Sequence, residues 1–122
     1  MITLYTADTQ NGIKIPIALE ELGLPYKMLR LDLGSGEQRS DAFLALNPNG
    51  RIPVLVDPRG PLGDAGIFES GAILWYLGET YPGLLPAAPD QRLLALQWLN
   101  FQVAAVGPMY GQAGFFLRSA PQ

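Results

Sequence analysis

Short apolar runs and longer amphipathic runs alternate along the first two thirds of the chain. Runs rich in β-branched or aromatic residues, bounded by Gly, Pro, Asn or Asp, predict strands at residues 1–5, 26–33, 52–57 and 65–70. Apolar residues spaced three or four apart predict helices at residues 11–23, 40–46 and 72–81. The order is therefore βαβ, a short helix, then ββα. The first two strands should be parallel because a helix joins them.

The ends of the first helix and the burial of the second strand are also predicted. Asn11 is a favoured residue for capping the helix start, and Gly23 suits the left-handed position after its end. Met28 and Leu29 indicate that the second strand is partly buried.

A proline-rich segment separates this pattern from a long apolar helix. Three prolines in nine residues predict a linker. This divides the chain into a first domain at 1–82, a linker at 83–91 and the start of a helical domain at 92–122. The helix over 91–111 is apolar nearly all round, so it should be buried on several sides and should end or kink at Gly107–Pro108. We expect either that further helices follow or that this burial is between subunits.

The amino-acid composition excludes several kinds of chemistry and binding partner for this chain. The chain has 122 residues, 48% of them apolar, and a net charge of −3, which indicates one globular chain without the basic patch that nucleic acid requires. It contains neither cysteine nor histidine, so thiolate metal sites and a protein thiol nucleophile are excluded and no metal is expected. Any sulfur chemistry must use the sulfur of a ligand. The lack of a long apolar run or signal-like start favours a cytoplasmic protein without a membrane partner.

Two motifs carry a family resemblance. They are "NPNGRIPVLVD" at 47–57 and "IFESGAILWYL" at 67–77, and "TQNGIKI" at 9–15 and "LQWLNFQVAAVGPMYGQ" at 96–112 extend the match. Together with the element order, they resemble the glutathione transferase superfamily: a thioredoxin-like α/β domain with a mixed sheet, followed by the start of an all-α domain. The whole pattern is similar to the bacterial Nu class, known as glutathione-dependent disulfide oxidoreductases. The chain departs from that class at Gln10, where proline is usual.

The second motif implies a binding site for the γ-glutamyl end of glutathione. Ser70 opens a helix, where free N–H groups and the positive end of the dipole attract a carboxylate. Glu69 could take the ammonium group of the same ligand. The plainer interpretation is that Ser70 only caps the helix.

The first motif implies a site for the rest of the tripeptide. In the resemblance, Pro53 follows a cis bond and Ile52 pairs its backbone with the cysteinyl part of glutathione. Gln38 and Arg51 could reach the glycine carboxylate or nearby carbonyls, with Arg51 forming a charge-assisted bond. Alternatively, Pro53 is an ordinary trans proline, and Arg51 and Gln38 are solvated surface groups.

The loop before the first helix is the expected sulfur end. A thiol with a reference pKa of about 8.5 needs stabilisation as a thiolate to react at neutral pH. The hydroxyl of Thr9 and the amide of Asn11 are the expected donors, with Tyr5 as a rival. The plainer alternative is a turn and helix cap, which Asn11–Gly12 also suits.

These features lead to one functional hypothesis and two alternatives. The resemblance implies a homodimeric enzyme that reduces a small disulfide with glutathione, or oxidised glutathione, as co-substrate. The first alternative is conjugation of glutathione to small electrophiles, as in detoxification, and the second is a non-catalytic glutathione-binding or regulatory module.

Two groups of aromatic residues follow the linker. Trp98 and Phe101 suit a core or dimer seam, whereas the later group either walls an apolar pocket or packs on other helices: Tyr110, Phe115 and Phe116.

Overall fold

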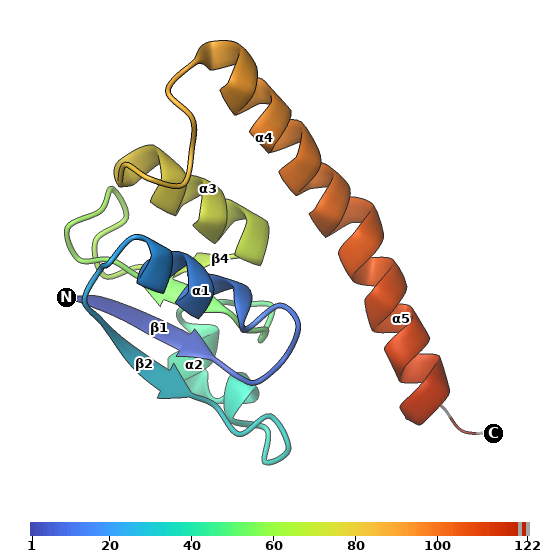
Figure 1. Cartoon of the computed structure of the whole chain (residues 1–122). Coiled ribbons are helices and arrows are strands. Elements are labelled where there is room, and N and C mark those ends of the chain that lie inside the picture. Colours follow the sequence, from blue (N-terminus) through green and yellow to red (C-terminus); the bar gives the residue numbers. More distant parts are fainter. Residues whose placement is uncertain (120, 122) are drawn as a thin grey trace. The chain divides into compact units, whose positions relative to one another are not determined.

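The computed structural model describes residues 1–119 and 121, and it divides into two compact units. The first unit is Met1–Leu84, and the second begins at Leu85 (Figure 1). Each unit is considered by itself below.

The first unit is built on a four-stranded sheet with the order β2-β1-β3-β4. Its strands are β1 (Ile2–Thr6), β2 (Tyr26–Arg30), β3 (Val54–Val56) and β4 (Ile67–Phe68). β1 pairs parallel with β2 and antiparallel with β3, and β3 pairs antiparallel with β4. The predicted order of elements along the chain and the parallel first pair are confirmed, although β2, β3 and β4 are each shorter than the predicted apolar runs.

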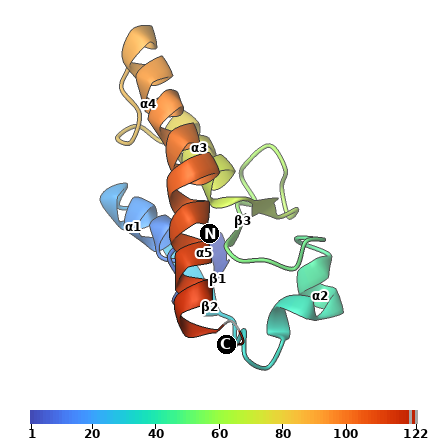
Figure 2. The ribbon, with the colours of Figure 1, turned by 90° about the vertical axis from the view of Figure 1, so that its right-hand side faces the viewer.

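Helices cover both faces of this sheet. They are α1 (Lys14–Glu21), the 3₁₀ turn η1 (Glu37–Arg39), α2 (Asp41–Leu44) and α3 (Ser70–Thr80). α1 and α3 lie on one face and α2 lies on the other (Figure 2). This is a thioredoxin-like arrangement, as the element order predicted.

The alternation of side chains along β1 explains the two layers, because successive strand residues point to opposite faces. Ile2 and Leu4 are fully buried in the core cluster that the sheet forms with α1 and α3. Tyr5 points to the other face, where its ring packs edge to face against Phe43 of α2. Ser40 caps α2 by accepting a hydrogen bond from the Phe43 N–H.

Of three local predictions for the first unit, one is wrong, one holds in part and one is confirmed. Asn11 does not cap α1, because the helix begins only at Lys14 and a turn occupies the residues before it. β2 is partly buried at Leu29, as predicted, but Met28 is 39% exposed because β2 is at the edge of the sheet. Gly23 has the predicted left-handed conformation (φ 62°), and the hydrogen bonds of a Schellman motif close the helix there.

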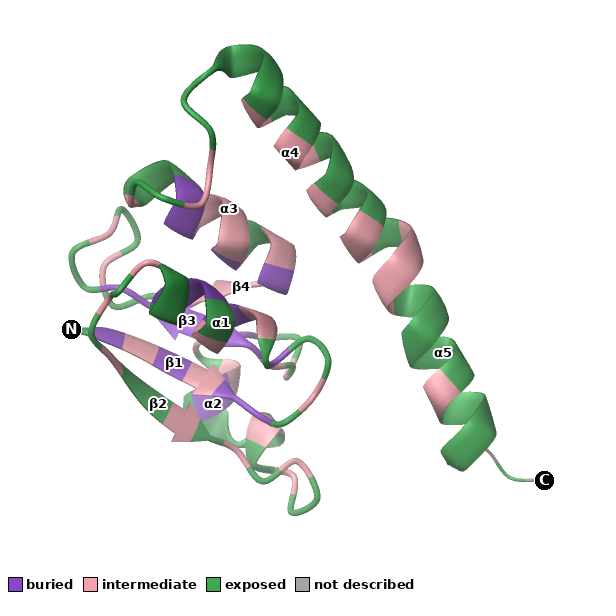
Figure 3. Ribbon diagram, viewed as in Figure 1, coloured by how far each residue is buried: buried purple, intermediate pink, exposed green. Residues whose placement is uncertain are grey.

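The second unit is one long helical segment. It comprises α4 (Pro89–Phe101), the π-helical segment η2 (Gln102–Val106) and α5 (Gly107–Arg118). The helix does not end at Gly107–Pro108; the wider π-helical segment ends at Val106, just before this pair, where Pro108 has no N–H to donate. Of the described residues in this unit, none is buried (Figure 3), so the expected burial on several sides is not provided within it.

Candidate functional site

Most of the sequence-predicted site residues line one pocket of about 300 Å³ in the first unit. They come from three segments that are distant in the sequence: the β1–α1 loop, the η1 turn and the segment before β3. Leu33 and Gly50 complete a wall that otherwise consists of predicted residues: Thr9, Asn11, Gln38, Arg51 and Ile52. The fold therefore forms a polar pocket between the β1–α1 loop, the η1 turn and the segment before β3.

The β1–α1 loop is held in one shape by hydrogen bonds within it. The Thr9 hydroxyl accepts from the Gly12 N–H (3.0 Å), and the Thr6 hydroxyl donates to the Gly12 carbonyl (2.8 Å). A side chain at Gly12 would collide with the Ala7 carbonyl, so only glycine is accommodated. A hydroxyl that accepts one bond keeps its own proton to donate, so Thr9 can still act as a donor. Gln10 is exposed.

Lys14 connects this loop to the start of α3. Its Nζ lies 3.0 Å from Asn11 Oδ1 and 3.3 Å from the hydroxyl of Ser70. Burial lowers the pKa of Lys14. Ser70 is buried at the first turn of α3 and does not line the 300 Å³ pocket. The side chain of Lys14 alone bridges it to Asn11.

The segment before β3 has the backbone geometry that the sequence suggested. The Ile52–Pro53 peptide bond is cis, and Pro53 is buried. The buried side chain of Asn47 donates to the Arg51 carbonyl (2.7 Å) and accepts from the Asn49 N–H (3.0 Å). Asn47 thus holds the turn, and Arg51 lies exposed at the pocket wall.

Gln38 carries a buried acceptor that its own chain does not use. Its Nε2 donates to the Leu33 carbonyl (3.3 Å). Its Oε1 is buried and has no hydrogen-bond partner among the residues that the structure describes. Because a buried acceptor without a partner is unfavourable by about 1–3 kcal/mol, Gln38 is suited to accept a donor from a ligand.

Glu69 has an unusual backbone conformation. Its φ of 71° is the one positive value among the described non-glycine residues, and it directly precedes the first residue of α3. Such a conformation is unfavourable by about 1–3 kcal/mol and clusters at functional sites. The carboxylate of Glu69 is exposed next to Ser70, outside the group of residues that lines the 300 Å³ pocket.

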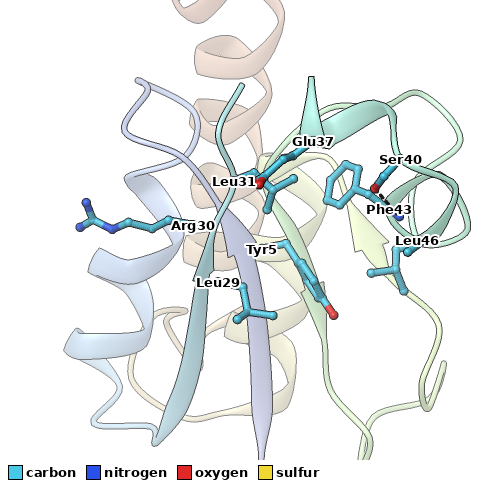
Figure 4. A pocket seen from close by; sticks show the side chains of 9 residues that line it. Tyr5, Leu29, Arg30, Leu31, Glu37, Ser40, Phe43 and Leu46 are labelled. Atoms are coloured by element: carbon cyan, nitrogen blue, oxygen red, sulfur yellow. Dashed lines mark hydrogen bonds between the residues drawn. The ribbon is translucent and has the colours of Figure 1, made fainter. Parts of the chain in front are cut away.

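Tyr5, the rival sulfur donor, lies in a different pocket. That pocket, of about 440 Å³, lies between the sheet and α2, and Tyr5 shares it with Leu29, Leu31, Phe43 and Leu46 (Figure 4). None of the residues that line the Thr9 and Asn11 pocket also lines this one. The geometry therefore favours Thr9 and Asn11 over Tyr5.

The aromatic residues of the second unit are exposed. Trp98 packs edge to face on Phe101 with 62% of its surface exposed, so these two residues form no buried core within the second unit. Phe115 and Phe116 also pack edge to face, and Tyr110 is exposed.

The site residue that sequence reasoning missed is Lys14. A signal for it exists: a cation in the first turn of a helix is disfavoured by the dipole, so a lysine there requires a specific partner. The spacing from Asn11 to Lys14 is the second sign, because three residues bring side chains together near a helix start.

The described residues provide neither a metal-binding cluster nor a membrane-spanning helix. In that part of the chain, no acidic, histidine or cysteine residues cluster in a way that could hold a metal ion. Within the same residues, no helix has both the length and the apolar character needed to cross a membrane.

Comparisons with known proteins identify relatives. Residues 1–79 match the family model of the glutathione S-transferase N-terminal domain. The chain is 45% identical over 124 residues to the disulfide-bond oxidoreductase YfcG of Escherichia coli, covering 100% of this chain and 58% of that protein.

Two solved structures extend the comparison to ligands. A glutathione transferase homologue from Lodderomyces elongisporus, with two glutathione molecules per subunit, has a TM-score of 0.90 and 45% identity, over 99% of this chain and 58% of its own. A glutathione transferase from Pseudomonas putida, with one glutathione disulfide per subunit, has a TM-score of 0.92 and 46% identity, over 98% of this chain and 52% of its own. The chain thus spans a little over half the length of these relatives.

Proposed function

The chain belongs to the glutathione S-transferase family, and from this and from the pocket we propose that the protein reduces small disulfides with glutathione as the electron donor. The observation that carries this proposal is the pocket itself, where Thr9 and Asn11 lie beside Gln38 and Ile52. In a chain without cysteine, such donors suit a sulfur that a ligand brings.

The tripeptide would be held along its length. The backbone of Ile52 pairs with the cysteinyl part as an added strand would. The glycine carboxylate lies near the Arg51 guanidinium, and the glycine N–H is the donor for the unpaired Oε1 of Gln38. The γ-glutamyl carboxylate binds the Ser70 hydroxyl and the N–H groups that open α3, and Glu69 takes the ammonium group.

The sulfur would lie at the β1–α1 loop. The Thr9 hydroxyl and the Asn11 amide donate hydrogen bonds to it, which favours the thiolate over the thiol. The thiolate attacks one sulfur of the substrate disulfide, and the other sulfur leaves as a thiolate. A second glutathione thiolate attacks the mixed disulfide, so two glutathione molecules are oxidised to glutathione disulfide and the substrate becomes two thiols. The protons of the two glutathione thiols pass to the two leaving groups.

Relatives support both the reaction and the ligand. One is named a disulfide-bond oxidoreductase, and solved relatives contain either two glutathione molecules or one glutathione disulfide per subunit. The two glutathione molecules correspond to the reductant that the two steps consume together, and the glutathione disulfide corresponds to the product of the second step. We further propose a homodimer, tested by light scattering, and a cytoplasmic location, where reduced glutathione is the prevailing thiol.

The test compares two substrates with the protein at its natural length. Turnover of bis(2-hydroxyethyl) disulfide with glutathione is expected to exceed turnover of a chlorodinitrobenzene, and Thr9→Ala with Asn11→Ala should reduce it about 100-fold. Higher activity on the arene would replace reduction with conjugation. A protein that binds glutathione but turns over neither substrate would be a binding module instead.

A further inference from the structure

The side chain of Lys14 connects the two ends of the proposed glutathione site. It contacts Asn11, at the sulfur end, and Ser70, at the γ-glutamyl end. We infer that Lys14 is a positioning residue that fixes the Asn11 amide with its NH₂ group toward the sulfur and holds the Ser70 hydroxyl in place. This inference rests on the proposed function, because it concerns the same sulfur.

The argument from hydrogen-bond chemistry is direct. A lysine ammonium group has three donors and no acceptor, whereas an asparagine amide has an acceptor oxygen on one side and a donor NH₂ on the other. The group 3.0 Å from Lys14 Nζ must therefore be the amide oxygen of Asn11. Asn11 also lines the pocket, so with its oxygen on Lys14 its NH₂ is the half left to face a ligand.

The orientation matters because the two halves of the amide affect a thiolate in opposite ways. The NH₂ group stabilises a thiolate and lowers the pKa of the thiol, whereas the carbonyl oxygen repels it. The hydrogen bond from Lys14 is the contact that fixes the orientation of the Asn11 amide. Without Lys14, either the oxygen or the NH₂ group of the amide can face the sulfur. Part of the population would then present the oxygen, and the bound thiol would become less acidic.

The position of Lys14 in the fold supports a dedicated role. It is the first residue of α1, where the dipole of the helix disfavours a cation, and its side chain is half-buried. Both conditions oppose the charge, and burial lowers its pKa accordingly. The contacts with Asn11 and Ser70 offset part of that penalty and place the charge between the two ends of the ligand.

Other charged groups around the site are on neighbouring elements. Asp8, in the same loop, is paired with Arg30 at 2.9 Å on the exposed edge strand β2. Arg51 lines the pocket before β3, and Glu69 precedes α3. All four groups are retained in the variants below, so a change in the thiol pKa reports on position 14.

The experiment measures the thiolate absorbance of bound glutathione as a function of pH, in the protein at its natural length. Lys14→Met should raise the pKa of the bound thiol by about 1, which at neutral pH reduces the thiolate fraction up to tenfold. Lys14→Gln keeps an uncharged donor on a side chain one bond shorter and should retain part of the effect, and Lys14→Arg should retain most of it. Lys27→Met, on exposed β2, is the matched control and should leave the pKa unchanged.

A double-mutant cycle with Asn11→Ala separates the possible outcomes. If Lys14 acts through Asn11, Lys14→Met should add little once Asn11 is alanine. A thiol pKa that rises in Asn11→Ala but not in Lys14→Met would overturn the positioning role and leave the proposed function standing. Equal, additive shifts from the two changes would also overturn it, since Lys14 would then act by its charge alone. An unchanged pKa in Asn11→Ala would remove Asn11 from the proposed mechanism and the positioning role with it.

Discussion

The same two elements, β3 and α3, carry polar clusters of opposite character at their two ends. At one end, Pro53 precedes β3 and Ser70 opens α3, beside the candidate site. At the other end, Asp57 follows β3 and Tyr81 follows α3. The first cluster lines a pocket and includes a buried acceptor without a partner among the described residues, whereas the polar groups of the second cluster bond to one another.

The closed cluster is centred on Asp57, whose side chain is 1% exposed. Its carboxylate accepts from the hydroxyls of Tyr76 (2.9 Å) and Tyr81 (2.6 Å) and from the Arg59 N–H (3.0 Å). Burial, followed by the hydrogen bond to Asp57, raises the pKa of Tyr76 to about 12. Burial alone would raise the pKa of Asp57, but the bonds from Tyr81, Arg59 and Tyr76 and the Arg59 charge together lower it.

The difference shows how a buried polar group that stabilises the fold can be told apart from one that binds a ligand. Both carboxylate oxygens of Asp57 accept hydrogen bonds from donors of its own chain, so Asp57 stabilises the fold. Gln38 leaves Oε1 without a partner among the described residues, which is unfavourable in the free protein and becomes favourable only when a ligand supplies the donor. Substitutions at the two ends should therefore separate stability from binding.

The largest expected effect is at the closed end. Asp57→Ala removes an acceptor of three hydrogen bonds and should lower the free energy of unfolding by about 3 kcal/mol, measured by urea denaturation. The matched control is Asp8→Ala, which removes an ion pair with side chains 75% and 62% exposed and should change stability by less than about 1 kcal/mol. Equal losses from the two changes would contradict the assigned role of Asp57.

The next largest effect is expected at the candidate site, where the affinity for glutathione should change. Glu69→Gly relieves the positive φ, so it should keep or raise the melting temperature, yet it removes the carboxylate proposed for the ligand ammonium. Affinity for glutathione, measured by calorimetry, should fall about 30-fold, equivalent to about 2 kcal/mol. A drop in stability with unchanged affinity would show that the conformation serves the fold alone.

Gln38→Met is expected to have a smaller effect of the same kind. It removes both the unpaired acceptor and the weak bond to the Leu33 carbonyl, so the free energy of unfolding should change by less than about 0.5 kcal/mol. Glutathione affinity should fall about tenfold because the ligand loses an acceptor. If stability falls and affinity does not, Gln38 belongs with Asp57 as a structural group.

The smallest expected effect is a change in the pH dependence of stability. The pKa of Asp57 in the folded protein is below its unfolded value of about 3.9. Its contribution is thus present above the unfolded pKa and is lost as the pH falls through the folded pKa. In acid denaturation at a series of pH values, Asp57→Asn should show a shallower loss below about pH 4 than the unchanged protein. Identical slopes would mean that other carboxylates dominate.

The sequence predicted much of the first unit, because its signals are local. Periodicity and glycine positions specify β1, α1 and the Gly23 turn, and two motifs identify the residues that the fold then brings to one pocket. Asn11 was a poor guide to the start of α1, because the loop instead uses Thr9 to bond the Gly12 N–H. The exposure of Met28 depends on strand order, which places β2 at the edge.

By itself, then, the sequence determined the order of elements, the family and the types of side chain that surround a ligand sulfur. Only the tertiary structure decided which of them act together. It separated Tyr5 from Thr9 and Asn11, placed Lys14 between Asn11 and Ser70, and joined Asp57 to two tyrosines of α3 and the segment after it. The physical reason is that these contacts join residues far apart along the chain, and only packing of helices on the sheet brings them within hydrogen-bond distance.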